Sequence, residues 1–244
     1  MIGKFRSEDE VFYGEIENGQ VYHQDGIHAG IYELAELRIL PPASPSKIVC
    51  IGLNYRDHAR ELSMRIPDDP VLFIKPPSAV IGHGDKIIYP ASSSRVEYEA
   101  ELAIVICKRC KNISAERAED VIAGYTCFND VTARDLQQKD GQWTRAKSFD
   151  TFAPFGPYLA SPNELDVSNA KITCRVNGIT RQESSTSNLI FDVPYLIEFI
   201  TEIMTLEVGD VIATGTPPGV GEIHRGDTVE VEIQGIGTLL NEVV

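Results

Sequence analysis

The sequence predicts a mainly β protein with a few helices, because apolar runs of strand length alternate with turns rich in glycine, proline and asparagine. The strand candidates lie at 11–16, 21–23, 47–52, 71–78, 102–107, 124–131, 171–176, 228–234 and 237–244. Helical patterns are fewer, and they lie at 55–62, 114–123, 132–139 and 193–204. The run 102–107 is apolar at every position, which indicates a strand buried on both faces.

Two parts are expected along the chain. Residues 1–42 have the pattern of a small β-rich unit, with an Asn-Gly hairpin signal at 18–19 between two short strands. A proline-rich crossing then leads into the main β domain, residues 43–244. His23 and His28 are expected at the surface of the N-terminal unit.

The charge and the cysteine content limit the class of partner. The formal net charge of the 244 residues is −14, so nucleic acid and anionic membranes are not expected partners. An anionic substrate must therefore be held locally, by a metal ion or by particular cationic side chains. The five cysteines favour reduced thiols in a cytoplasmic protein over a disulfide framework. The N-terminus lacks the apolar segment of a signal peptide, and no stretch is long enough to span a membrane.

Three glutamates precede the buried run at every second position. Glu97, Glu99 and Glu101 share one face of a β-strand, because side chains alternate between faces. If that face is buried, the clustered carboxylates need a counter-charge, and a hard divalent cation such as Mg²⁺, Mn²⁺ or Ca²⁺ supplies it. The alternative is a solvated acidic face on an exposed strand.

A histidine and a glutamate are neighbours in the first helical pattern of the main domain. His58 and Glu61 are three residues apart, so they lie on one helix face. A carboxylate beside an imidazole orients the ring and raises its basicity, which makes the pair a candidate general base. An ordinary pair on a helix surface fits the spacing equally well.

Further along the chain, three features have both a functional and an ordinary interpretation. Asp130 interrupts an apolar strand, as a metal ligand or a helix N-cap would. Lys147 stands among small and aromatic residues, either as a desolvated cation that faces a substrate oxygen or as a surface lysine. The Gly/Pro turn 214–221, which contains Thr216, can bring N–H groups to an anion but lacks the features of a P-loop.

Six stretches occur together in the order that is typical of one enzyme family. They are GLNYRDHA at 52–59, FIKPPSAV at 73–80, VEYEAEL at 96–102, NDVTARDLQ at 129–137, AKSFDTFAPFGP at 146–157 and TGTPPGVG at 214–221. Through them the chain resembles the fumarylacetoacetate hydrolase family over about residues 47–235. The resemblance implies a mixed β-sandwich roll of that family's C-terminal domain type, with the N-terminal β-rich unit as an appendage. It also implies a homodimer with one Mg²⁺ or Mn²⁺ per active site, for which Ca²⁺ is a substitute.

The resemblance also implies roles for particular residues. It makes Glu99, Glu101 and Asp130 the metal ligands, and it leaves Glu97 either next to those ligands or solvated. His58 and Glu61 match the lid pair that activates a water, and Lys147 matches the lysine that stabilises developing oxygen charge. Gln137 matches a residue near the water, and Thr216 and Arg134 match substrate-binding positions. Leu53 is a departure, because some acylpyruvate-cleaving members carry arginine there.

The expected function is that of a metal-dependent enzyme acting on a 2-oxo or 2,4-dioxo acid. Hydrolysis of a C–C bond in an acylpyruvate or fumarylpyruvate, through a metal-stabilised enolate, is expected first. The alternative is isomerisation of 2-hydroxyhepta-2,4-diene-1,7-dioate or decarboxylation of an oxaloacetate-type acid, because both use the same enolate. A non-catalytic protein that binds a metal or a 2-oxo acid is a third hypothesis, against which the presence of base, ligands and lysine argues.

Overall fold

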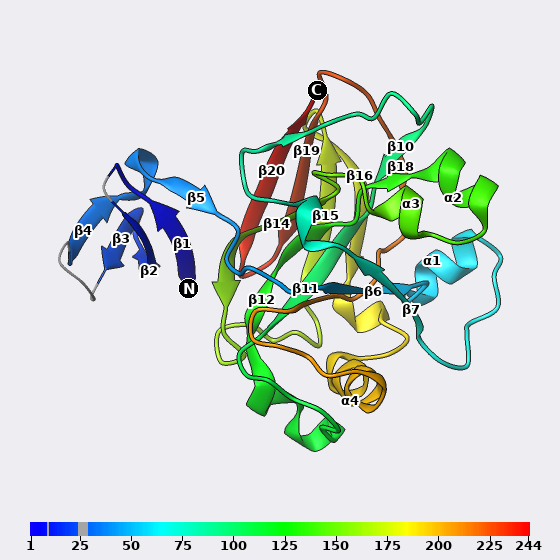
Figure 1. Cartoon of the computed structure of the whole chain (residues 1–244), viewed down its shortest axis with the longest axis horizontal. Helices are drawn as coiled ribbons and strands as arrows, with labels where there is room; N and C mark the ends of the chain where they lie inside the picture. Colours follow the sequence, from blue (N-terminus) through cyan, green and yellow to red (C-terminus); the bar gives the residue numbers. More distant parts are fainter. Residues whose placement is uncertain (9, 24–28) are drawn as a thin grey trace.

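The computed structural model describes residues 1–8, 10–23 and 29–244. The fold consists mainly of strands, which form three sheets (Figure 1). The largest sheet has the order β4 (Gly30–Glu33), β3 (Gln20–His23), β2 (Val11–Glu17), β1 (Ile2–Arg6), β14 (Ala153–Ala160), β12 (Ile122–Asn129), β11 (Ala100–Ile106), β17 (Val211–Ala213), β6 (Ile48–Gly52) and β7 (Val71–Lys75), with β5 (Arg38–Leu40) beside β1 and β8 (Val80–Ile81) beside β14. The three-stranded sheet has the order β13 (Thr132–Ala133), β10 (Val96–Tyr98) and β18 (Gly221–Ile223). The five-stranded sheet has the order β16 (Ile179–Ser185), β15 (Lys171–Val176), β19 (Thr228–Ile233), β20 (Gly237–Val243) and β9 (Lys86–Ile87).

The helices are short and few beside the strands. They are α1 (Arg56–Glu61), α2 (Arg134–Asp140), α3 (Thr144–Lys147) and α4 (Val193–Ile203), with the 3₁₀ helices η1 (Leu34–Glu36), η2 (Pro77–Ala79), η3 (Ala115–Val121) and η4 (Thr186–Asn188). Parallel pairs such as β6–β17 occur among mostly antiparallel ones, so the sheets are mixed. This architecture confirms the predicted fold class.

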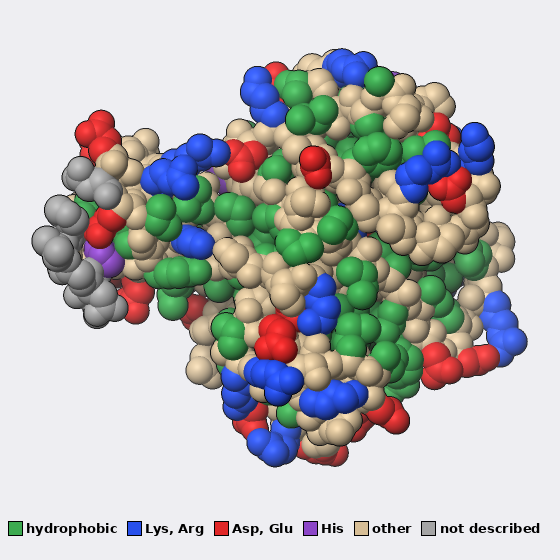
Figure 2. Space-filling model, in the orientation of Figure 1, with side chains coloured by type: hydrophobic (Ala, Val, Ile, Leu, Met, Phe, Trp, Pro, Cys, Tyr) green, Lys and Arg blue, Asp and Glu red, His purple; other side chains and the backbone are tan. Residues whose placement is uncertain are grey.

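The N-terminal strands β1 to β5 form a lobe beside the main body (Figure 1). Its own small core contains Phe5, Phe12 and Val21. Strand β1 also pairs with β14 of the main body, which joins the lobe to the largest sheet. On the face in Figure 2, basic and acidic side chains are interspersed, and hydrophobic side chains are visible where the lobe meets the body.

The expectation that His23 lies at the surface is wrong. The side chain of His23 is buried, its ring stacks on Phe12 with 4.4 Å between centroids, and its Nε2 lies 3.3 Å from a carboxylate oxygen of Glu10. Burial follows because β3 turns this position toward the small apolar core of the lobe. His28 lies outside the residues that the structure describes.

Strand β11 is the buried strand that the apolar run predicts. All of its residues are buried, and it pairs with β12 on one side and β17 on the other. Its side chains alternate between two cores, since Leu102 and Ile104 pack in one hydrophobic cluster whereas Ala103 and Val105 pack in another. The strand is therefore held rigidly at the point where Glu101 projects from it.

The helical predictions hold for α1 and α4 and for most of α2, whereas two stretches need correction. Asp192 caps α4 by accepting a hydrogen bond from the Tyr195 N–H at 3.0 Å, and Leu196 and Ile200 face the core as expected. Ile203 is exposed, because the helix ends there. The stretch 114–123 is a 3₁₀ helix followed by the start of β12, and 132–139 begins as a strand. In the described part of the chain, no helix is both long enough and apolar enough to cross a membrane.

A buried aspartate anchors the entry into the main body. The carboxylate of Asp210, just before β17, accepts hydrogen bonds from the Ser46 N–H at 2.9 Å, the Ser46 hydroxyl at 2.7 Å and the Glu207 N–H at 2.8 Å. It also pairs with the Lys47 ammonium group. Burial alone would raise the pKa of Asp210, but these partners outweigh burial and lower it. The contacts hold the start of β6 against β17.

We expect Asp210→Asn to lower the free energy of unfolding at pH 7 by about 3 kcal/mol, since it breaks a buried, hydrogen-bonded ion pair. Because the folded-state pKa of Asp210 is lowered, its contribution is present above the ordinary pKa and is lost as pH falls through the folded pKa. The difference between wild type and variant should therefore shrink on acidification. Urea unfolding at pH 7 and at lower pH measures this difference. Asp120→Asn, at a half-exposed aspartate, is the control. Equal effects of the two substitutions would contradict the anchoring role.

Candidate metal centre and active site

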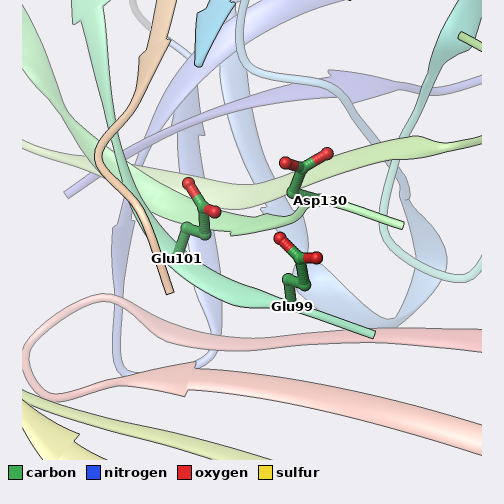
Figure 3. Close-up of side chains that lie close together, drawn as sticks. All are labelled: Glu99, Glu101 and Asp130. Atoms are coloured by element: carbon green, nitrogen blue, oxygen red, sulfur yellow. The ribbon is translucent and has the colours of Figure 1, made fainter. Parts of the chain in front are cut away.

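Three buried carboxylates from the neighbouring ends of two strands of the main body converge on one space (Figure 3). Glu99 and Glu101 flank Ala100 at the start of β11, and Asp130 directly follows β12. The antiparallel register places Ala100 opposite Asn129, so the two strand ends meet, and the Asp130 N–H donates to the Glu99 carbonyl at 2.8 Å. One oxygen of each carboxylate lies within 4.8 Å of the others. The helix N-cap alternative for Asp130 is excluded, because Ala133 occupies that position of α2.

Two buried lysines balance part of this negative charge. The Lys147 Nζ, at the end of α3, lies 2.9 Å from Glu99 Oε2 and 2.6 Å from Asp130 Oδ2. Lys75, at the end of β7, pairs with the other oxygen of Asp130 and donates to the Val131 carbonyl at 3.0 Å. Burial would lower the pKa of Lys147, but the two carboxylates outweigh burial and raise it. Lys147 is 2% exposed, which excludes the alternative of a surface lysine.

Glu99 is held in its ionised form by its cationic neighbours. Burial would raise its pKa, but Lys147 and Arg134 outweigh burial and lower the pKa to about 2. The Arg134 guanidinium contacts Glu99 Oε1, and the Thr132 hydroxyl lies 3.1 Å from the same oxygen. Glu99 is thus a fixed acceptor at the edge of the cluster.

Glu101 differs from Glu99 because, among the described residues, no lysine or arginine pairs with it. Its Oε2 accepts one hydrogen bond, from the Gly215 N–H at 2.8 Å. Burial raises the pKa of Glu101, and the nearby Asp130 and Glu99 raise it further. The cluster therefore carries negative charge that its protein partners do not fully neutralise.

The residues of this cluster fit a hard divalent cation. All three side chains offer carboxylate oxygens, which are the ligands that Mg²⁺, Mn²⁺ and Ca²⁺ take in proteins. Lys147, Lys75 and Arg134 pair with Glu99 and Asp130, and Arg134 is shared with Glu97, so Glu101 is the carboxylate of this cluster for which a bound cation would supply the positive partner. The alternative of a solvated acidic face is excluded, since Glu99 and Glu101 are 6% and 1% exposed.

The predicted histidine–glutamate pair is formed on α1. The His58 Nδ1 lies 2.8 Å from Glu61 Oε2, and both side chains line the same pocket as the carboxylate cluster. Because a carboxylate only accepts, it fixes the proton of the neutral ring on Nδ1 and leaves Nε2 with a lone pair. The pair is therefore arranged as a base, which is more than a helix-surface contact.

One loop holds both halves of the site. In the Gly/Pro turn 214–221, the Gly215 N–H binds Glu101 and the Gly219 N–H donates to Glu61 Oε1 at 3.1 Å. Both glycines have positive φ, of 97° and 93°, which favours glycine. The N–H groups that the sequence assigns to an anionic ligand are thus used on the protein's own carboxylates.

The pocket between these groups has a volume of about 640 Å³, within the usual range for a small-molecule site. It is lined by Ile51, Gly52, Leu53, His58, Glu61, Leu62, Met64, Phe73, Arg95, Glu97, Glu99, Glu101, Arg134, Gln137, Gln138, Trp143, Lys147, Thr216 and Val220. The Thr216 hydroxyl donates to the Ala100 carbonyl at 2.9 Å and accepts from Gln182 at 2.8 Å, so it presents an oxygen that is already fixed. Gln137 accepts from Arg134 on the opposite wall.

Glu97 is buried beside the metal cluster, which excludes the solvated position. One of its oxygens lies 2.6 Å from Arg95 Nε, and the other lies 2.6 Å from Arg134 Nε. Arg134 in turn contacts Glu99 and Gln137 through its other two nitrogens. Glu97 therefore orients an arginine that touches an expected metal ligand.

Sequence reasoning missed several residues that shape the site. Lys75 follows an apolar strand, so its local pattern does not show that it is fully buried against Asp130. Phe73 lies under Lys147 with 5.0 Å from Nζ to the ring centroid, and Trp143 packs edge-on against Phe73 at 5.1 Å. In the sequence, the one signal for the buried position of Lys75 is that this lysine belongs to an otherwise apolar strand.

We expect Glu101→Gln to weaken Mn²⁺ binding at least about 100-fold, because loss of a ligand should cost no less than loss of a ligand's partner. The amide oxygen still accepts from Gly215, so the metal-free protein should stay as stable as wild type. Calorimetric titration with Mn²⁺ and thermal unfolding measure the two effects. Glu183→Gln, at an exposed glutamate, is the control. Unchanged Mn²⁺ affinity in Glu101→Gln would refute the site.

We expect Gly215→Ala to lower stability and Mn²⁺ affinity together, because a Cβ there would lie 2.8 Å from the Asn54 Cβ and the residue has positive φ. Gly226→Ala is a matched control, since Gly226 has a φ of 93° with no atom near the added Cβ. It should cost about 1 kcal/mol of stability and leave Mn²⁺ affinity unchanged. Equal losses in both variants would show that backbone strain alone, and not the contact, matters at Gly215.

Comparisons with known proteins agree with this geometry. Residues 47–244 match the family model described as fumarylacetoacetate (FAA) hydrolase C-terminal. The chain is 45% identical to a 5-carboxymethyl-2-hydroxymuconate delta-isomerase from Mycobacterium smegmatis, with a TM-score of 0.92 over 100% of this chain and 98% of that one. It is 35% identical to a fumarylacetoacetate hydrolase from Exiguobacterium antarcticum, with a TM-score of 0.90 over 99% and 98%.

Among curated proteins, the chain is 42% identical to a mitochondrial oxaloacetate tautomerase of Rattus norvegicus, over 84% of this chain and 69% of that protein. These relatives are enzymes with different named reactions, an isomerase, a hydrolase and a tautomerase. The family model covers the whole main body, including the carboxylate cluster and the His58–Glu61 pair. The chain therefore belongs to the fumarylacetoacetate hydrolase family.

Proposed function

We propose that this protein catalyses proton transfer on a 2-oxo acid, as keto–enol tautomerisation or double-bond isomerisation, with a divalent metal as cofactor. One observation carries the proposal: a single pocket is lined by Glu99 and Glu101 of the buried carboxylate cluster, by Lys147, and by the base His58 with Glu61. Glu99, Glu101 and Asp130 would hold the Mg²⁺ or Mn²⁺, and Ca²⁺ would be a substitute. The homodimer that the resemblance implies and the cytoplasmic location that the cysteines favour stay predictions.

The residues divide the chemistry between charge and proton. A divalent cation in the cluster would supply Lewis acidity toward the carboxylate and 2-oxo oxygens of the substrate. Lys147 keeps its proton and stays positive where oxygen charge develops, because two carboxylates raise its pKa. His58 offers Nε2 to take a proton from the carbon next to the oxo group or to return it, while Glu61 stabilises the charged ring.

We propose proton transfer as the reaction, although the sequence alone favours C–C hydrolysis. The relatives named as an isomerase and as a tautomerase are more similar to this chain than the relative named as a hydrolase. In tautomerisation a proton moves between the carbon next to the oxo group and the enol oxygen, and in double-bond isomerisation it moves between two carbons. A single base that takes the proton at one atom and returns it at the other can serve both reactions, and His58 lines the pocket.

C–C hydrolysis is the second candidate, because the same pair can act on a water. His58 and Gln137 both line the pocket, whose volume accommodates a water beside a small acid. A proton taken from that water would direct attack on a distal carbonyl. Product analysis separates the two candidates, since only hydrolysis breaks the carbon skeleton.

The test is turnover of the purified, Mg²⁺- or Mn²⁺-loaded protein on oxaloacetate, 2-hydroxyhepta-2,4-diene-1,7-dioate, acetylpyruvate and fumarylpyruvate. We expect metal-dependent change of the enol absorbance with an intact carbon skeleton for at least one acid. Cleavage products would transfer the assignment to hydrolysis, and loss of carbon dioxide would transfer it to decarboxylation. No turnover above the protein-free rate on any acid would overturn the proposal.

We expect His58→Gln to lower kcat by about 10²- to 10⁴-fold, the usual contribution of a positioned base. Mn²⁺ affinity should not change, because the contacts described for His58 involve Glu61 and not the carboxylate cluster. His224→Gln, at a histidine that is 67% exposed, is the matched control. A kcat within threefold of wild type would remove His58 from the reaction.

A further inference from the structure

Among the described residues, three lysine and arginine side chains line the pocket, and two of them each pair with two buried carboxylates. Lys147 is 2% exposed and lies between Glu99 and Asp130. Arg134 is 19% exposed, and its three nitrogens contact Glu97, Glu99 and Gln137. Both are thus held by carboxylates and are mostly buried.

Arg95 is different because it has spare donors. Its side chain is 54% exposed, and its described guanidinium contact is with Glu97 alone, through Nε and Nη2 at 2.6 Å. The guanidinium carries five N–H donors, so Nη1 and the outer hydrogens remain for a ligand. Since Glu97 is 4% exposed and fixed by Arg134 as well, Arg95 is anchored rather than free to sample solvent.

The charges around Arg95 favour an anion. Arg95 and Arg134 both contact Glu97, and Arg134 also contacts Glu99, so two guanidinium groups stand beside two carboxylates at this wall, and Arg95 is the more exposed of the two. Successive ion pairs connect it to Glu99 at the metal cluster. The exposed fraction of the side chain increases from 9% for Glu99 through 19% for Arg134 to 54% for Arg95. Arg95 therefore lies at the mouth of the pocket and the carboxylate cluster lies at its floor.

The rest of the lining suits a carbon chain between these two ends. Leu53, Leu62, Met64 and Val220 are apolar residues that line the same pocket. A ligand with an oxo-acid group at the floor and a second carboxylate at the mouth would place apolar methylene groups against them.

We propose that Arg95 binds the second carboxylate of a 2-oxo dicarboxylic acid and thereby selects dicarboxylates over 2-oxo monocarboxylates. Glu97 acts as the positioning residue that holds the guanidinium in place, which reduces the entropy lost on binding. A guanidinium can bind that carboxylate with two parallel hydrogen bonds. This inference rests on the proposed function for the identity of the oxo-acid end, and it adds the group that reads the other end.

The test measures binding, so it does not depend on turnover. Calorimetric titration of the Mn²⁺-loaded protein compares 2-oxoadipate with 2-oxohexanoate, and 2-oxoglutarate with 2-oxopentanoate. The acids of each pair differ only in the terminal carboxylate. We expect wild type to prefer the dicarboxylate about 10- to 100-fold at one chain length at least, the usual effect of a hydrogen bond between charged groups. Arg95→Gln should abolish that preference and leave the Kd of the monocarboxylate within twofold.

Two further variants separate recognition from general effects. Arg95→Lys keeps the charge but not the planar fork, so it should retain part of the preference. Arg109→Gln removes an equally single-paired arginine that is 71% exposed and is not among the pocket-lining residues, so it should change nothing. The preference should fall with added salt, because Arg95 is half exposed.

The inference is overturned if wild type shows no preference at either chain length, or if Arg95→Gln keeps the preference. It is also overturned if Arg95→Gln weakens both acids of a pair equally, because that result indicates a displaced Arg134 and not a lost ligand contact. Failure of the proposed function has a separate signature: the preference persists and depends on Arg95, but no oxo acid is turned over.

Discussion

Repulsion among three buried carboxylates is the constraint on which the site depends. Burial of one unpaired carboxylate is already costly, and one oxygen from each of Glu99, Glu101 and Asp130 lies within 4.8 Å of the others. The chain answers with Lys147, Lys75 and Arg134, each from a different element. That answer is incomplete at Glu101, and a divalent cation completes it. The cation is thus both the proposed cofactor and the missing part of the charge balance.

The same loop connects this balance to the base. Its backbone N–H groups bind Glu101 at one end and Glu61 at the other, so the metal cluster and the His58 pair are positioned by one short segment. Positive φ at both glycines allows the backbone to approach the two carboxylates closely. The relatives of this chain are named for isomerase, tautomerase and hydrolase reactions, so one fold hosts several reactions.

The sheets supply the rigidity that this arrangement needs. β11 is buried on both faces and pairs on both edges, so Glu101 projects from one of the least mobile parts of the molecule. His58, by contrast, stands on the single short helix α1, with Glu61 nearly half exposed beside it. The carboxylates of the candidate metal site lie in or next to the ends of two paired strands, whereas His58 lies on a short helix at the surface.

Much of this was open to prediction from local pattern. Alternating glutamates before an apolar run, an aspartate inside a strand, and a His–Glu pair at helical spacing each have a physical signature in the sequence. Together with the order of six motifs they determined the fold class and the candidate site. Tertiary structure alone decided which lysines are buried, that Glu97 joins two arginines, that His23 is enclosed by the N-terminal lobe, and that Arg95 has spare donors. The physical reason is that burial and ion pairing depend on partners dozens of residues away, as with Lys75 and Asp130, whereas strand and helix periodicity is written in neighbouring residues.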